Sequence, residues 1–230
     1  MHSSRSSIAY QNFGLEVFIY IAPQMSPNWT EAPVPQPSKI LLVIALEEEA
    51  TPVKAALSQQ YSWEHIEVCV TGVMEHNALS QTAYALTQGR FHTIFNFGSA
   101  GLVGARAGEL RLGDSVLVNQ TERFDCYLPY SDYDAEFAPL EVVVPPTKLP
   151  SASCASGNRF TDGQGHSSAL EDCECYGLAH LAKRFSKRFA SLKFISNIAG
   201  DCGNADVLNH STPSAENVRD LLGIAQGMCA

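Results

Sequence analysis

The sequence lacks the excess of basic residues that proteins binding nucleic acids or anionic membranes usually carry. Its 230 residues include 15 lysines and arginines against 24 aspartates and glutamates, which gives a formal net charge of −9. Because a nucleic-acid backbone and an anionic membrane surface both repel an acidic protein, we expect neither as the main partner. The composition favours a small ligand that is uncharged or cationic.

Long apolar runs and typical metal-ligand spacings are also lacking. No apolar stretch approaches the roughly 20 residues that a membrane-spanning helix needs. The seven cysteines include no CxxC pair and no histidine spacing of the zinc type, so we expect free thiols and no metal site. The N-terminal apolar stretch is interrupted by Glu16 and preceded by a single arginine, unlike a cleaved secretory signal. We therefore expect a cytoplasmic protein, with an organellar presequence as the alternative.

The composition changes near residue 37. Residues 1–37 begin with a serine-rich stretch and end in a proline-rich one, and prolines disfavour both helices and central strands. We interpret this segment as a disordered or extended tail. Residues 38–230 have the length expected of one domain with a single hydrophobic core.

Short apolar runs alternate with helical patterns from residue 39 onward. The predicted strands are ILLVIAL, IEVCVTG, TIFNFG, LGDSVLVN, EVVV and LKFISNIA. The predicted helices are residues 47–60, 76–89, 174–189 and 212–225, and the glycine-rich stretch GSAGLVGARAG is expected to be a turn. This alternation predicts an α/β fold of three layers, with a central mixed, largely parallel twisted sheet flanked by helices.

Four polar stretches follow or open these elements where such sheets bind ligands, at the carboxyl ends of strands. They are ALEEEA, FGSAGL, LEDCECYG and ISNIAGD. Each has an ordinary structural interpretation, as acids at a helix start, a tight turn or an asparagine cap. Each also has a functional one, since a carboxylate can activate water, glycines let the backbone approach a ligand, and an amide can bind a heterocycle. Taken singly, the stretches leave both interpretations open.

Together, these stretches resemble the nucleoside phosphorylase/nucleosidase superfamily, most closely its methylthioadenosine/S-adenosylhomocysteine nucleosidase branch. The similar motifs are LEEE at 46–49, GSAG at 98–101, LRLGD at 110–114, GNRF at 157–160, DCEC at 172–175 and ISN at 195–197. The resemblance covers most of residues 39–225 and implies a fold like that of purine nucleoside phosphorylase. It also implies a small-molecule purine nucleoside as substrate, a homodimer or higher homo-oligomer, and no cofactor or metal.

The resemblance implies roles for individual residues. Glu49 would activate the attacking water, and Asn197 takes the place of an aspartate that protonates purine N7. The implied substrate-binding residues are Ser99, Gly101, Phe160, Cys173, Glu174 and Ser196, with Phe160 against the base and Glu174 on the ribose hydroxyls. In this chemistry the N-glycosidic bond breaks through an oxocarbenium-like state while a nucleophile attacks the opposite face of the sugar.

Asn197 leaves the base and the reaction open, because an amide donates a hydrogen bond but cannot give up a proton. It is compatible with a 6-oxopurine nucleoside, with slow hydrolysis of an adenine nucleoside, or with binding alone. A phosphorylase would need arginines around the phosphate, and the candidates Arg106 and Arg123 are better explained as surface or salt-bridge residues. We therefore expect a purine nucleosidase, with a phosphate-dependent phosphorylase or a non-catalytic nucleoside-binding protein of the same fold as alternatives.

Overall fold

The computed structural model describes residues 39–59, 63–126, 138–159, 161, 163–200 and 212–229. The predicted tail at residues 1–37 and the candidate base-binding residue Phe160 lie outside the described residues.

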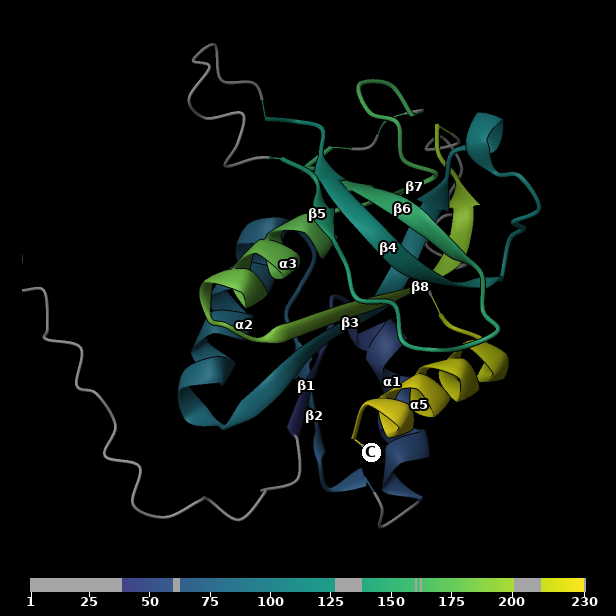
Figure 1. The fold of residues 1–230 in the computed structure, drawn as a ribbon. Helices are drawn as coiled ribbons and strands as arrows, with labels where there is room; N and C mark the ends of the chain where they lie inside the picture. Colours follow the sequence, from purple (N-terminus) through teal and green to yellow (C-terminus); the bar gives the residue numbers. More distant parts are fainter. Residues whose placement is uncertain are drawn as a thin grey trace, which may run out of the picture. The chain divides into compact units, whose positions relative to one another are not determined.

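The described strands form one mixed sheet (Figure 1). They are β1 (Lys39–Ile44), β2 (Ile66–Val70), β3 (Phe91–Leu102), β4 (Ser115–Arg123), β5 (Leu140–Glu141), β6 (Ser151–Ser156), β7 (Leu170–Asp172) and β8 (Arg188–Ile198). Parallel pairing joins β1 to β2 and β3, β3 to β8, and β6 to β4 and β7. Antiparallel pairing joins β3 to β7, and β4 to β5 and β8. The prediction of a mixed, largely parallel sheet is confirmed.

Part of the sheet closes on itself. β8 pairs with both β3 and β4, while β3 also pairs with β7, β7 with β6, and β6 with β4. These five strands therefore form a ring with a barrel-like closure, which was not predicted, and the pairing does not establish three separate layers. The closure brings the ends of β3, β7 and β8 side by side, although they lie far apart in the sequence.

The helices pack on two faces of the sheet. The described α-helices are α1 (Glu47–Ser58), α2 (Glu75–Gln88), α3 (Cys175–Arg184) and α5 (Ala215–Cys229). Alternate residues of β1 face different pairs of helices: Leu42 belongs to the apolar cluster of α1 and α5, and Leu41 to that of α2 and α3 (Figure 1). Because both faces of β1 are buried, its sequence is an unbroken apolar run. Among the described helices, none combines the length and apolarity needed to cross a bilayer.

Three segments differ from the sequence prediction. β3 continues through the predicted GSAG turn to Leu102 and pairs with β8 along this stretch. The helix predicted to reach residue 189 ends at Arg184, and β8 begins at Arg188. Of EVVV, only Glu141 belongs to a strand, whereas the short strands β6 and β7 were missed. These two strands consist largely of small or polar residues, so they lack the apolar pattern that predicts a strand.

The last helix begins with a reciprocal cap formed by Ser214 and Asn217. The backbone N–H of Asn217 donates to Ser214 Oγ (3.2 Å), and the backbone N–H of Ser214 donates to Asn217 Oδ1 (2.9 Å). Asn217 Nδ2 also donates to Gly113 O (2.8 Å) and to Ser115 Oγ (2.9 Å). This reciprocal cap satisfies the free groups at the helix start and ties α5 to the beginning of β4.

Candidate functional site

The acidic run at the start of α1 separates into one buried and two exposed side chains. Glu49 is 1% exposed, whereas Glu48 is exposed and Glu47 forms an exposed ion pair with Lys54 (2.6 Å). Ser99 donates to Glu49 Oε1 from its backbone N–H (2.9 Å) and from Oγ (2.8 Å). The N–H of Leu46 donates to Oε2 (3.2 Å). These three hydrogen bonds hold the Glu49 carboxyl group in one orientation beside β3.

The glycine at position 98 makes room for this carboxylate. A Cβ atom at that position would lie 3.2 Å from Glu49 Oε2 and 3.4 Å from Oε1. A side chain at residue 98 would therefore crowd the carboxylate, which would have to shift by a few tenths of an ångström. The backbone at residue 98 is part of a continuous strand and does not itself require a glycine. The glycine is needed because its small size leaves space for Glu49.

Glu174, the residue before α3, is a second buried carboxylate. Its side chain is 7% exposed, and its Oε1 accepts the backbone N–H of Met74 (2.8 Å). The pKa of Glu174 is raised to about 7: burial is the largest cause, and the negative charges of Asp172 and Glu49 also raise it, while Lys193 and the Met74 hydrogen bond lower it. The effect of the Glu49 charge shows that the two candidate carboxylates lie within electrostatic reach of each other.

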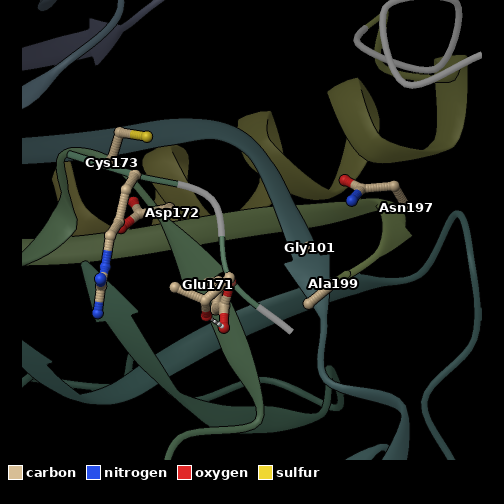
Figure 2. Close-up of a pocket in the computed structure, with 8 residues that line it drawn as sticks. Gly101, Glu171, Asp172, Cys173, Asn197 and Ala199 are labelled. Atoms are coloured by element: carbon tan, nitrogen blue, oxygen red, sulfur yellow. Dashed lines mark hydrogen bonds between the residues drawn. The ribbon is translucent and has the colours of Figure 1, made fainter. Parts of the chain in front are cut away.

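Asn197 and Cys173 line one small cavity, on either side of Gly101 (Figure 2). Gly101 pairs with Glu171 on β7 and with Asn197 on β8, so it lies between them in the sheet. The cavity measures about 30 Å³ and is lined by Gly101, Arg159, Thr161, Glu171, Asp172, Cys173, Asn197 and Ala199. This is a small fraction of the volume of an ordinary ligand pocket, so the cavity as it stands does not hold a purine.

Two hydrogen bonds fix the orientation of the Asn197 amide. Its Nδ2 donates to the backbone carbonyl of Ile198 (3.1 Å), and its Oδ1 accepts from Ser196 Oγ (2.8 Å). A carbonyl oxygen can only accept, so the nitrogen must be the atom that faces Ile198. One N–H of the amide is left to donate to a ligand, and Ser196 acts by holding Asn197.

Glu171, which was not predicted as a site residue, anchors the chain beyond Phe160. Its Oε1 accepts the backbone N–H of Gly163 (2.8 Å), faces His166 Nε2 (2.7 Å), and accepts from Thr161 Oγ1. Since Glu171 and Thr161 both line the cavity, this carboxylate fixes one wall of it. The sequence placed Glu171 in a cluster of acids but gave no indication of its partners.

A buried ion pair lies behind the cavity. Lys193 Nζ lies 2.6 Å from Asp172 Oδ2, and both side chains are 1% exposed. Asp172 Oδ1 also accepts from Ser156 Oγ (2.5 Å), and Oδ2 accepts the backbone N–H of Cys175 (3.0 Å). Burial alone would lower the pKa of Lys193, but the charge of Asp172 raises it above its usual range. The ammonium group of Lys193 therefore keeps its charge in the interior.

Replacing Lys193 by Met should lower the free energy of unfolding by about 3–5 kcal/mol, because it leaves the Asp172 carboxylate buried without its partner. Urea denaturation measures this loss. The Asp172→Asn/Lys193→Met double variant should lose less than the sum of the two single variants. Strictly additive losses would contradict a coupled pair.

The sequence did not predict that Asp172 would lie among potential metal ligands. Cys154, Asp172 and Cys175 place ligand atoms within 4.8 Å of one another. However, both Asp172 oxygens already have donors, and the ammonium of Lys193 would repel a cation. The contact with Cys175 and burial raise the pKa of the Cys154 thiol, although metals bind the thiolate. The arrangement favours two packed thiols, and the six described cysteines are all free: Cys69, Cys126, Cys154, Cys173, Cys175 and Cys229.

The two arginines weighed as phosphate ligands have other partners. Arg106 is exposed and donates to the backbone carbonyls of Ser168 and Gly163, both at 3.0 Å. Arg123 forms ion pairs with Glu75 (2.5 Å) and Asp125 (2.8 Å). Their interpretation as surface and salt-bridge residues is confirmed.

The candidate residues in the described part of the chain converge on one edge of the sheet. Ser99 and Gly101 lie at the end of β3, and Ser196 and Asn197 at the end of β8. Glu49 is in the first turn of α1, while Cys173 and Glu174 lead into α3. Sequence analysis missed Met74, which binds Glu174, and the wall residues Arg159, Thr161 and Ala199. Nothing in the local sequence distinguishes these from ordinary loop residues.

The sequence matches no known protein-family model, and it has no significant match among curated proteins. Solved structures are nevertheless similar. The 5′-methylthioadenosine/S-adenosylhomocysteine nucleosidase of Colwellia psychrerythraea, solved with adenine, has a TM-score of 0.70 at 17% identity, covering 84% of this chain and 95% of that one. The Arabidopsis thaliana 5′-methylthioadenosine nucleosidase has a TM-score of 0.69 at 18% identity, covering 82% and 93%.

A third similar structure is a mutant futalosine hydrolase of Helicobacter pylori, with a TM-score of 0.62 at 15% identity, covering 83% of this chain and 98% of that one. At these identities the likeness concerns the fold. The chain therefore has the fold of solved nucleosidases over most of the length of each of the three.

Proposed function

We propose that the protein is a purine nucleosidase, which hydrolyses the N-glycosidic bond of a purine nucleoside. The observation that carries this proposal is the contact of buried Glu49 with Ser99, within electrostatic reach of Glu174, at the strand ends of a nucleosidase fold. Such hydrolysis requires a carboxylate that activates water and a donor at the leaving group, and hydrogen bonds to the sugar hydroxyls add further stabilisation. The expected homo-oligomer stays a prediction.

Glu49 supplies the nucleophile in this proposal. Ser99 holds Oε1 with two hydrogen bonds, which fixes the carboxylate without neutralising it. A water molecule beside the carboxylate can lose a proton to Glu49 as it attacks the anomeric carbon. Glu174 binds the sugar: the N–H of Met74 occupies Oε1, and among the described residues Oε2 has no hydrogen-bond donor. That oxygen can accept from the ribose hydroxyls.

Asn197 assists the departing base by donating its remaining N–H. This orientation favours a 6-oxopurine, whose N7 and O6 are both acceptors on one edge. An adenine would present N7 beside a donor amino group, and that amino group would have to share the amide oxygen with Ser196 Oγ. The partners of Arg106 and Arg123 favour water over phosphate as the nucleophile.

The test is to incubate the protein with inosine, adenosine and methylthioadenosine, with and without phosphate, and to measure free base by chromatography. We expect hypoxanthine from inosine without phosphate, faster than adenine from either adenine nucleoside. A strict phosphate requirement would identify a phosphorylase instead. Nucleoside binding without release of base at any protein concentration would identify a binding protein.

Acidification should reduce activity through Glu174. Its pKa of about 7 means that the ionised form is present above pH 7 and is lost as the pH falls through that value. If the ribose hydroxyls need the carboxylate, kcat/KM should fall about tenfold per pH unit below 7. A pH profile of kcat/KM measures this, and Glu174→Gln should lower kcat/KM and remove that limb. An unchanged limb in the variant would assign it to another group.

A further inference from the structure

Met74 has a backbone conformation that residues other than glycine rarely adopt. Its φ is 84° and its ψ is 146°, which falls outside the left-handed helical region that other residues occasionally visit. Among the described non-glycine residues only Ser186 also has a positive φ, and its value of 53° is that of an ordinary left-handed turn residue. The conformation of Met74 is therefore strained, and strain of this kind concentrates at functional sites.

The strained conformation directs a backbone donor at the candidate sugar-binding carboxylate. The N–H of Met74 donates to Glu174 Oε1 (2.8 Å), 100 positions away in the chain. On the other side of the same residue, the carbonyl of Met74 accepts from the N–H of Ala78 (3.1 Å), in the first turn of α2. Met74 thus serves both as the N-cap of α2 and as a donor to Glu174.

Contacts on both sides prevent Met74 from relaxing. Before it, the N–H groups of Thr71 and Gly72 donate to the carbonyls of Ile44 and Ala45, both at 2.9 Å, and so continue the pairing of β1 with β2. After it, Glu75 Oε2 is bound to Arg123, which also pairs with Asp125. We call these three residues the Glu75–Arg123–Asp125 bridge.

The bridge is connected to a segment that lines the cavity. Asp125 Oδ2 accepts the backbone N–H of Asn158 (2.7 Å), next to the cavity residue Arg159. One set of ion pairs therefore ties the start of α2 to the segment that borders the cavity. An ordinary N-cap of α2 would not require a link from Glu75 through Arg123 and Asp125 to Asn158.

We propose that Met74 is a positioning residue: the Glu75–Arg123–Asp125 bridge holds it in a strained conformation that aims its N–H at Glu174 and leaves the other carboxylate oxygen for the ligand. The importance of the ligand contact rests on the proposed function. The positioning itself is a property of the protein and can be measured without substrate.

Besides the N–H of Met74, three charged groups act on Glu174, and a test must keep them constant. They are Asp172, Lys193 and Glu49. Arg123→Lys meets this condition because it keeps the positive charge. A lysine lacks the planar fork that holds Glu75 and Asp125 at once, so the bridge should loosen. Glu75→Gln is a second way to weaken the same bridge, should the first variant fold poorly.

The experiment is a carbon-13 NMR titration of the Glu174 carboxyl group, assigned with Glu174→Gln, in the wild type and in Arg123→Lys. Loss of the aimed N–H should move the titration midpoint of Glu174 upward by about half a pH unit or more. Met74→Ala keeps the bridge and the N–H, so its midpoint should stay at the wild-type value. An unmoved midpoint in both Arg123→Lys and Glu75→Gln would overturn the proposal.

A matched pair of variants tests the strain. Met74→Ala and Met74→Gly both remove the side chain, but only glycine adopts this backbone readily. At an ordinary position alanine gives the more stable protein. Here the glycine variant should unfold at the higher temperature, by about 2–8 °C. A more stable alanine variant would show that residue 74 is not strained.

These measurements separate this proposal from the proposed function. If no nucleoside is hydrolysed but the midpoint moves in Arg123→Lys, the positioning stands and the enzymatic assignment fails. If nucleosides are hydrolysed and the midpoint does not move, the positioning role of Met74 fails alone. In an active enzyme, Arg123→Lys should also shift the acidic limb of kcat/KM by the same amount as the titration.

Discussion

Glu49→Gln should reduce the release of purine base by about 10²–10⁴-fold, the usual contribution of a general base. Glutamine has nearly the same shape, and its amide oxygen can still accept the two hydrogen bonds of Ser99. It cannot take a proton from water. The variant should therefore fold and bind a nucleoside but fail to activate the nucleophile.

Single-turnover measurements at saturating protein, with chromatographic detection of the base, give the rate of this step. Calorimetric titration gives nucleoside affinity, which should change little. Glu48→Gln is a matched control, because Glu48 lies in the same helical turn but is exposed. Full turnover in Glu49→Gln would remove Glu49 from the mechanism.

Asn197→Asp should accelerate the release of adenine by about 10²–10⁴-fold, the effect expected when a general acid is supplied. The amide can only donate a hydrogen bond, whereas a carboxylic acid can transfer its proton to N7 as the bond breaks. The carbonyl of Ile198, which now accepts from Nδ2, would favour the protonated acid in the variant. The new carboxyl group should therefore be a proton donor.

The variant should also acquire a pH dependence that the wild type lacks, with adenine release falling as the pH rises and the acid ionises. Asn119→Asp makes the same chemical change in β4, outside the candidate site, and should leave the rate unchanged. Asn197→Ala should slow release from every nucleoside that the wild type hydrolyses. Equal rates for wild type and Asn197→Asp at all pH values would show that Asn197 does not contact the leaving base.

The sequence predicted that a buried strand is followed by a helix with Glu49 in its first turn, because the physical causes of this arrangement are local. An unbroken apolar run requires a strand buried on both faces, and three acids at its end suit a helix N-terminus. It could not show which acid is buried, since that depends on Ser99 and on the space above Gly98. The resemblance selected Glu49, and the structure shows how it is held.

The GSAG stretch shows why a local pattern misleads. Glycines at 98 and 101 are typical of a turn, but β3 continues through both, with a shift of its register against β8 between Ala100 and Gly101. Their small size admits the carboxylate of Glu49 and the amide of Asn197, which come from other parts of the chain. The conformation of Met74 was equally hidden, because it depends on ion pairs that link residues 75 and 123.

The ring of five strands has a consequence for synthesis. β3 can pair with β8 only after nearly all of the domain has been synthesised, because β8 begins at residue 188. Pairings so distant in sequence form slowly. A nascent chain therefore carries Ser99 long before Asn197 exists, and a nucleoside cannot act as a template for the emerging polypeptide. A nucleoside can bind only after the ring of five strands has formed. Ligand present during translation should therefore raise the yield of folded protein without increasing the rate of folding.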